Sequence, residues 1–150
     1  QDVIVAIRSI RGEMNIPHTK LCDVIINVHD DDKKTLIDEY IQYLRRLAKV
    51  QNVTIGSNLK KPKFSASAVI SGNEIFVPLE GLIDLEVERK RFEKEIKRYE
   101  TMLANTEKKL NDPNFISRAP ADIIEREKQK YENFKLTLEK LRQNYAYLVE

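Results

Sequence analysis

The 150-residue sequence has only one cysteine, no tryptophan and no long run of apolar residues. A single cysteine cannot form an intramolecular disulfide, which fits a reducing compartment, so we expect a cytoplasmic protein. Each apolar run is far shorter than the roughly 20 residues that a membrane-spanning helix needs, and the first residues show no signal-peptide pattern. We therefore expect no membrane contact.

The sequence also lacks the motifs of a catalytic centre. It has no glycine-rich phosphate loop, no Ser/His/Asp set and no convincing pair of carboxylates. His18 and His29 are too isolated to form a metal or catalytic site, and Cys22 lies in the apolar run LCDVIINV, which is typical of a buried residue. The acidic residues 30–32 begin a predicted helix, where they cap free N–H groups more often than they bind a metal. We predict no catalytic residue, metal or cofactor in this chain.

Residues 1–17 show helical periodicity. Val3, Ile7 and Ile10 are spaced three or four residues apart, as on one face of a helix. The residue before a proline disfavours the helical conformation, so this helix should end before Pro17. We expect the segment to be the terminal helix remnant of a larger helical domain, with its packing partners outside the sequence.

Residues 18–81 begin with a change of periodicity. Alternating apolar residues from Cys22 to Val28 predict a strand, and an amphipathic helix follows. The apolar stripe of that helix comprises Leu36, Ile37, Tyr40, Ile41, Leu44, Leu47 and Ala48.

Further strands are predicted in the rest of this segment. Residues 52–56 form one short strand, and residues 66–70 and 74–78 form a hairpin whose loop, residues 71–73, contains a glycine. One helix packed on a small sheet is the economical arrangement, so we predict an α+β unit.

Two later segments, residues 82–110 and 120–149, carry heptad patterns typical of a coiled coil. The a and d positions of the first are Leu82, Leu85, Arg89, Phe92, Ile96, Tyr99, Leu103, Thr106 and Leu110. Those of the second are Ile124, Glu127, Tyr131, Phe134, Leu138, Leu141, Tyr145 and Leu148. Only Arg89, Thr106 and Glu127 interrupt the apolar seam.

The connector and the flanking charges predict an antiparallel hairpin over residues 82–150. Pro113 cannot continue the first helix, and Pro120 suits the first turn of the second. The e positions are Glu86, Glu93, Glu100 and Glu107 in the first helix, and Lys128, Lys135 and Arg142 in the second. Antiparallel packing sets these rows opposite each other, whereas a parallel dimer would set like charges together, so we expect a monomer.

The outward face of the first helix is basic. It includes Lys90, Arg91, Lys94, Lys97, Arg98 and Lys108, with Asp84 as the sole acidic residue. Positive charge gathered on one long face favours a phosphate surface, although the net charge of +2 neither demands nor excludes nucleic acid. From the charge pattern alone, nucleic-acid contact, protein docking and simple solvation all stay open.

Three stretches resemble the valyl-tRNA synthetase family. LIDLEVE and KLNDPNFISRAPADIIEREK are similar to its C-terminal coiled-coil arm, and RSIRGEMNIP is similar to the end of its anticodon-binding helical domain. The matching positions are Arg8, Arg11, Glu13, Met14, Asn15, Pro17, Leu82, Ile83, Asp84, Glu86, Leu110, Asn111, Phe115, Ala119 and Pro120. The resemblance covers essentially the whole chain, but Gly12 stands where the family more often has alanine.

The resemblance implies a non-catalytic C-terminal region of a class I synthetase that joins valine to tRNA-Val with ATP. The implied partners are tRNA-Val and the catalytic, editing and anticodon-binding domains of the parent chain. The family's ATP-site signatures, of the HIGH and KMSKS type, are absent from the sequence. The arm would contact the tRNA backbone at its outer corner. The alternative is a structural adaptor whose coiled coil docks a protein partner.

Position and resemblance together nominate the residues that contact tRNA. They are Lys90, Arg91, Lys94, Lys97 and Arg98 on the first helix, Arg118 near the tip and Arg126 on the second helix. The resemblance implies that Arg8 and Arg11 instead face the anticodon-binding domain or the tRNA bound to that domain. Phe115 has two interpretations, because it can pack the hairpin tip or stack on an exposed base.

Overall fold

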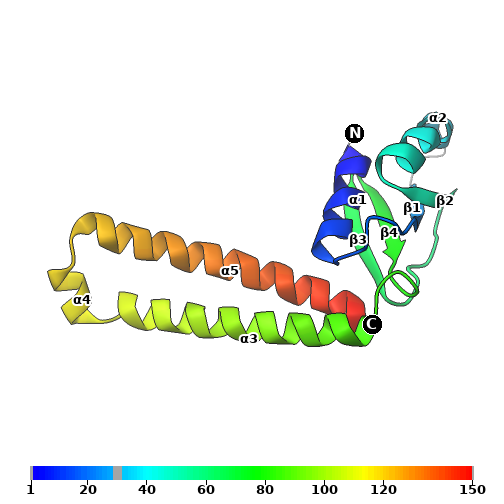
Figure 1. The fold of residues 1–150 in the computed structure, drawn as a ribbon. Coiled ribbons are helices and arrows are strands. Elements are labelled where there is room, and N and C mark those ends of the chain that lie inside the picture. The colour runs from blue at the N-terminus through cyan, green and yellow to red at the C-terminus, as the bar shows by residue number, and fades with distance from the viewer. Residues whose placement is uncertain (1, 29–31, 150) are drawn as a thin grey trace. The chain divides into compact units, whose positions relative to one another are not determined.

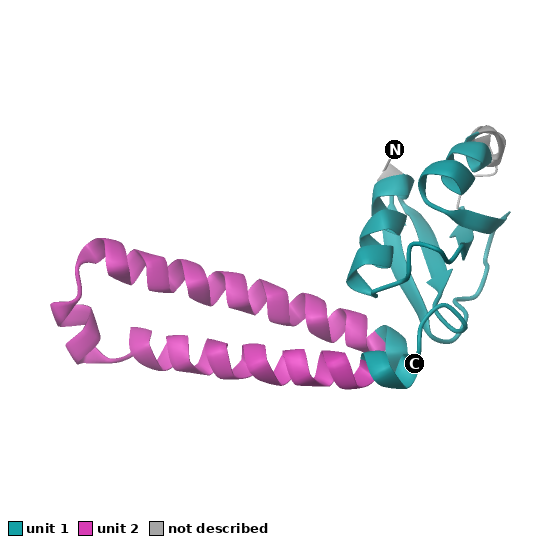
Figure 2. Ribbon diagram, in the orientation of Figure 1, with its two compact units in different colours: residues 1–88, 147–150 teal, residues 89–146 magenta. Residues whose placement is uncertain are grey.

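A computed structural model describes residues 2–28 and 32–149, without the side chains of residues 2 and 32–39. The chain divides into two compact units, with residues 1–88 and 147–150 in unit 1 and residues 89–146 in unit 2 (Figures 1 and 2). The expectations for His29, for the caps at residues 30–32 and for the apolar side chains of Leu36 and Ile37 lie outside the described residues and side chains.

Unit 1 is built on a four-stranded mixed sheet with the strand order β2-β1-β4-β3. The strands are β1 (Cys22–Asn27), β2 (Val50–Gly56), β3 (Ser65–Ile70) and β4 (Asn73–Pro78). β1 pairs in parallel with β2 and antiparallel with β4, and β4 pairs antiparallel with β3. A parallel pair needs a crossover connection, which here is α2 (Asp32–Leu47). The predicted α+β class is confirmed.

Local sequence explains the strands and their hairpin turn. Cys22, Val24 and Ile26 alternate along β1 and are at most 2% exposed, as their spacing predicts. The turn between β3 and β4 consists of Ser71 and Gly72, with φ angles of 51° and 79°. A two-residue hairpin turn with positive φ at both positions matches the twist of the strands, and glycine accepts such a φ without strain.

Helix α1 (Asp2–Glu13) contributes to the core of unit 1. Ile4, Ile7 and Ile10 are at most 7% exposed, and the helix contacts β3, β4 and α2 (Figure 1). The expectation that α1 packs on residues outside the sequence is therefore wrong for its apolar face. Periodicity identified the buried face of the helix, but it could not show what covers that face.

Arg11 fixes the loop that leads from α1 to β1. Its side chain is 8% exposed, and its Nη2 donates to the carbonyl oxygens of Pro17 at 2.9 Å and Lys20 at 2.7 Å. The Pro17 carbonyl also accepts from the Lys20 N–H at 3.0 Å, so the guanidinium adds two hydrogen bonds that tie this loop to the end of α1. The loop therefore has one defined path across the end of α1.

Unit 2 is an antiparallel helical hairpin (Figure 2). Its helices are α3 (Leu85–Leu110), the short α4 (Pro113–Arg118) and α5 (Ala121–Val149), of which α5 is 29 residues and about 44 Å long. Phe92 and Leu138 are at most 3% exposed, and Tyr99 packs edge-on against Phe134 with ring centroids 6.0 Å apart. The predicted helical hairpin is confirmed.

Two residues that interrupt the seam are buried and have polar partners. The Thr106 hydroxyl donates to the Met102 carbonyl at 2.9 Å. Glu127 is 8% exposed and lies 3.5 Å from Lys109 Nζ on α3 and 3.3 Å from Lys130 Nζ. One heptad separates these positions from Tyr99 and Phe134, so the polar pair forms the next layer of the seam.

Polar contacts between the flanks match the antiparallel register. Arg142 Nη2 lies 3.9 Å from Glu100 Oε2, one of the predicted e-to-e pairs, but both side chains are over half exposed, so the pair adds little stability. The Tyr145 hydroxyl donates to Glu93 at 2.7 Å. This hydrogen bond to a carboxylate raises the pKa of Tyr145, because it favours the protonated phenol.

The connector contains a helix that the sequence analysis did not predict. Asp112 Oδ1 accepts a hydrogen bond from the Asn114 N–H at 3.0 Å, and Pro113 occupies the first turn of α4. At the end of the helix, the Ala119 N–H donates a hydrogen bond to the Phe115 carbonyl at 2.9 Å. An Asp-Pro start is a good N-cap, but six residues are too few to show periodicity.

Replacing one seam leucine tests the packing of the hairpin. Leu138→Ala removes a side chain that is 3% exposed, so it should lower the free energy of unfolding by about 2 to 5 kcal/mol. Leu136→Ala on the same helix is the control, because Leu136 is 63% exposed and should change stability by at most about 0.5 kcal/mol. Urea unfolding followed by circular dichroism measures both, and equal effects would contradict the assigned seam.

Candidate nucleic-acid interface

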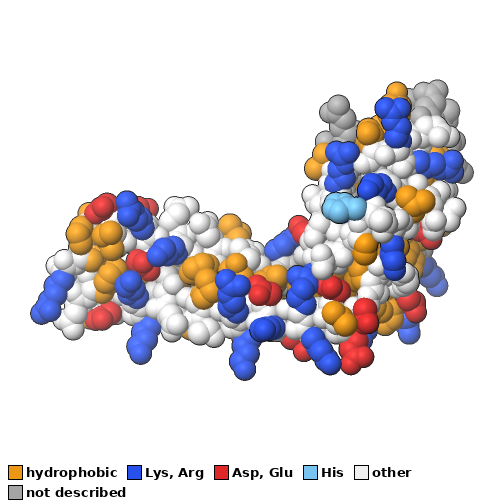
Figure 3. All heavy atoms as spheres, viewed as in Figure 1, with side chains coloured by type: hydrophobic (Ala, Val, Ile, Leu, Met, Phe, Trp, Pro, Cys, Tyr) orange, Lys and Arg blue, Asp and Glu red, His pale blue; other side chains and the backbone are white. Residues whose placement is uncertain are grey.

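The predicted cations of α3 lie on the side of the helix that faces away from α5. Lys90, Lys94 and Lys97 are exposed and follow at intervals of four and three residues, which places them on one face. Figure 3 shows Lys and Arg side chains spaced along this outer edge of the hairpin. The seam takes the apolar side chains of α3, so its cations remain in contact with solvent.

Lys94 and Lys97 are the most available of these cations. In the part of the chain that the structure describes, neither ammonium group has an ion-pair or hydrogen-bond partner. Each ammonium carries three donors and a full charge. A ligand phosphate can therefore bind there without first displacing a carboxylate of the protein.

Arg91 and Arg98 are held more firmly. The Arg91 guanidinium lies 4.4 Å from the centre of the Phe92 ring, and that of Arg98 lies 5.6 Å from the centre of the Tyr99 ring. Arg98 Nη1 also lies 3.4 Å from Glu95 Oε2. These contacts reduce the freedom of both side chains, and the ion pair neutralises part of the charge of Arg98.

The outward face of α5 differs in charge from that of α3. Its exposed side chains include both signs: Glu125, Arg126, Glu132, Glu139 and Lys140. Mixed signs are the usual pattern of a solvated helix face. The outward faces of the two helices therefore differ: that of α3 carries cations without carboxylates between them, whereas that of α5 carries both signs.

The remaining predicted contacts lie apart from the α3 cations. Arg118 is exposed in the last turn of α4, and Arg126 is exposed near the start of α5. Phe115 of α4 is half-buried, and Lys109 Nζ of α3 lies 5.1 Å from its ring centre. This contact supports the interpretation that Phe115 packs the hairpin tip, and its exposed part leaves stacking on a base open.

A hollow of about 710 Å³ near the tip adds a residue that was not nominated. It is lined by Asn105, Lys108, Lys109, Asn111 and Asp112. Lys108 had been identified only as part of the basic face. Its position three helical turns from Lys97, on the same side of α3, is the signal that supports adding it to the nominated contacts.

The described residues do not form a metal centre or a membrane-crossing helix. Within residues 2–28 and 32–149, no group of three or more His, Cys, Asp or Glu side chains could hold a metal ion. No described helix is long and apolar enough to cross a membrane. Cys22 is fully buried, and burial raises the pKa of its thiol despite the opposing charge of Arg11, so it stays protonated.

Comparison with protein families identifies the hairpin. Residues 84–148 match the family described as "Valyl tRNA synthetase tRNA binding arm". This part of the chain belongs to the tRNA-binding-arm family of valyl-tRNA synthetases. The match covers α3, α4 and most of α5, and the family description refers to tRNA binding rather than to catalysis.

Similarity to valine–tRNA ligases extends beyond the arm. The enzyme of Listeria innocua is 38% identical over 133 residues, which are 89% of this chain and 15% of that protein. Those of Nitratidesulfovibrio vulgaris and Lactobacillus johnsonii are 37% and 34% identical over 149 residues, which are 97% and 99% of this chain. The resemblance seen in the sequence is confirmed. The chain spans only 15 to 17% of the length of these relatives.

All the nominated cations lie inside the matched arm. Lys90, the first of them, and Arg126, the last, fall within residues 84–148. Which of them contact RNA stays a prediction.

The reactivity of Cys22 tests its structural role. Because the thiol is buried and its pKa is raised, it should react with a disulfide reagent far more slowly in the native chain than in urea. The raised pKa also means that its contribution to stability is complete at neutral pH and is lost as the pH rises through the native pKa. A chain with Cys22→Ala and Ser117→Cys is the control, since Ser117 is exposed. Equal native rates for the two thiols would contradict the buried position.

Proposed function

We propose that this chain is the tRNA-binding C-terminal region of a valine–tRNA ligase, and that the outward face of α3 contacts the tRNA backbone at its outer corner. Lys90, Arg91, Lys94, Lys97 and Arg98 form this basic face, with Arg118 and Arg126 as lesser contacts. The observation that carries the proposal is the array of exposed cations on α3, within a segment that matches a tRNA-binding arm.

The chemistry of the face favours recognition of phosphate groups. Lysine ammonium groups bind phosphate as point charges, while guanidinium groups can form two parallel hydrogen bonds. Contacts of this kind position an RNA without reading its bases. We therefore expect the arm to bind tRNA-Val and other tRNAs similarly, and the choice of tRNA to depend on other parts of the parent chain.

The same proposal covers the parent protein. Its remaining catalytic, editing and anticodon-binding domains would activate valine with ATP in the cytoplasm, while this region holds the tRNA. The apolar seam of α3 is covered by α5 of the same chain. The heptad seam of each helix is thus already occupied by the other, which supports a monomer.

Binding of tRNA to a charge variant tests the basic face. Changing Lys90, Arg91, Lys94, Lys97 and Arg98 to Gln should weaken binding at low salt about tenfold or more. Each lost phosphate contact should also lower the slope of log affinity against log salt by about 0.7 to 0.9. Fluorescence anisotropy with tRNA-Val and an unrelated tRNA at two salt concentrations measures both effects.

The control removes positive charge from the other helix. It carries Lys128, Lys135, Lys140 and Arg142 changed to Gln on α5 and keeps Lys130, which lies 3.3 Å from buried Glu127. Circular dichroism checks that both variants remain folded. If the two variants lose affinity equally, only the net charge matters and the assigned face is wrong. Salt-insensitive binding to a protein partner, without tRNA binding, would favour the adaptor alternative.

A further inference from the structure

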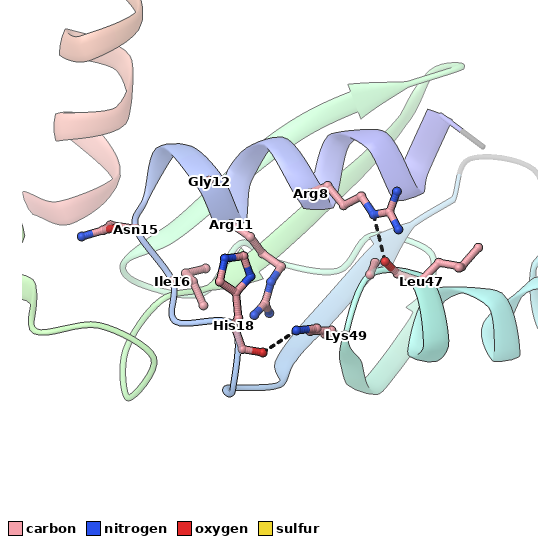
Figure 4. Close-up of a pocket in the computed structure, with 9 residues that line it drawn as sticks. Arg8, Arg11, Gly12, Asn15, Ile16, His18, Leu47 and Lys49 are labelled. Atoms are coloured by element: carbon pink, nitrogen blue, oxygen red, sulfur yellow. Dashed lines mark hydrogen bonds between the residues drawn. The ribbon is translucent and has the colours of Figure 1, made fainter.

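A second basic site lies in unit 1 and includes Arg8 and Arg11. A hollow of about 480 Å³ is enclosed by the end of α1, the loop that follows it and the end of α2 (Figure 4). Its lining residues are Arg8, Arg11, Gly12, Asn15, Ile16, His18, Leu47, Ala48 and Lys49. This lining contains three permanent cations and no carboxylate.

Each exposed cation of the hollow is anchored by one carbonyl group and keeps other donors free. Arg8 Nε donates to the Leu47 carbonyl at 2.9 Å, and Lys49 Nζ donates to the His18 carbonyl at 2.7 Å (Figure 4). Among the described residues, neither cation has a carboxylate partner. The anchors fix both groups at the hollow, and their remaining N–H groups are available to a ligand.

Arg11 adds a charge beneath these two. Its Nη2 donates to the carbonyl oxygens of Pro17 and Lys20. Its Nη1 is buried and has no hydrogen-bond partner in the part of the chain that the structure describes. A buried guanidinium without a carboxylate is costly, because its charge has lost water and gained no counter-charge. An anion in the hollow would compensate this charge through space.

The negative ends of helices α1 and α2 can balance only part of the positive charge that lines the hollow. The hollow lies at the C-terminal ends of α1 and α2, and each helix end carries about half a negative charge, or about one in total. Arg8, Arg11 and Lys49 together carry three positive charges. An excess of about two positive charges remains after both helix ends are neutralised, which is enough to balance the single negative charge of a backbone phosphodiester and exceeds what capping alone requires.

We propose that this hollow binds a backbone phosphate of RNA, as a contact separate from the basic face of α3. The proposal rests on the tRNA-binding function proposed above. A hollow of this volume exceeds what a single carboxylate fills, and exposed Asn15 and His18 at its rim can bond to a ribose or base beside the phosphate. The planar fork of Arg8 suits the oxygens of a phosphate.

Gly12 allows the charge of the hollow to be changed without removing a native side chain. It lies in the last turn of α1, and a Cβ built there meets nothing within 4 Å. Replacing glycine in a helix also favours folding slightly. Gly12→Glu should weaken tRNA binding at low salt about fivefold or more, Gly12→Lys should strengthen it, and Gly12→Gln should stay within about twofold of the wild type.

The ring signals of His18 give a local readout of the same event. They should shift in NMR spectra when tRNA is added, and the shift should be lost in Gly12→Glu; His18→Gln assigns the signals. Poly-glutamate serves as a second probe, because it presents carboxylates in place of phosphates. If it shifts the signals as strongly as RNA, the hollow takes an acidic protein segment and the RNA proposal is wrong.

The α3 charge variant separates the two proposals. If it binds weakly while the Gly12 variants all bind like the wild type and His18 does not respond, the hollow is not an RNA site and the arm function stands. If the wild type binds no tRNA at low salt, both proposals fail. Weaker binding by Gly12→Glu and stronger binding by Gly12→Lys, with Gly12→Gln unchanged, support the hollow as an RNA site.

Discussion

The packing of α3 against α5 determines which side chains of unit 2 remain available to other molecules. Phe92, Leu138 and the Tyr99–Phe134 pair occupy the seam, so Lys90, Lys94 and Lys97 lie on the opposite side of α3. Burial of these side chains supplies most of the stability, because the exposed flank pairs contribute little. A basic face of defined geometry is therefore a consequence of the apolar seam.

The seam also includes a polar layer that fixes the register. Glu127 is buried between Lys109 and Lys130, and heptad spacing places it opposite Thr106. Sliding one helix along the other would separate buried Glu127 from Lys109 of α3 and leave it with Lys130 of its own helix, which is costly. The register in turn sets which outward residues of α3 share a face. Lys109 thus helps to position the hairpin tip, where it also contacts Phe115.

Local patterns predicted the hairpin well and the site in unit 1 poorly. The heptads and the rows of opposite charge lie within single helices, so the sequence shows them directly. The partners of α1 were missed because its apolar face packs on strands that come much later in the chain. Arg8 and Leu47 are 39 residues apart in sequence, so their contact depends on tertiary structure and no periodicity indicates the hollow.

Photo-crosslinking from the two outer faces of the hairpin tests the assigned RNA surface most directly. A photoreactive phenylalanine derivative replaces exposed Thr101 on α3 in one chain and exposed Gln143 on α5 in another. Irradiation with tRNA at low salt should give a crosslink from position 101 and little from position 143. Equal crosslinking from both positions, or crosslinking only from position 143, would contradict the assignment of the RNA surface to α3.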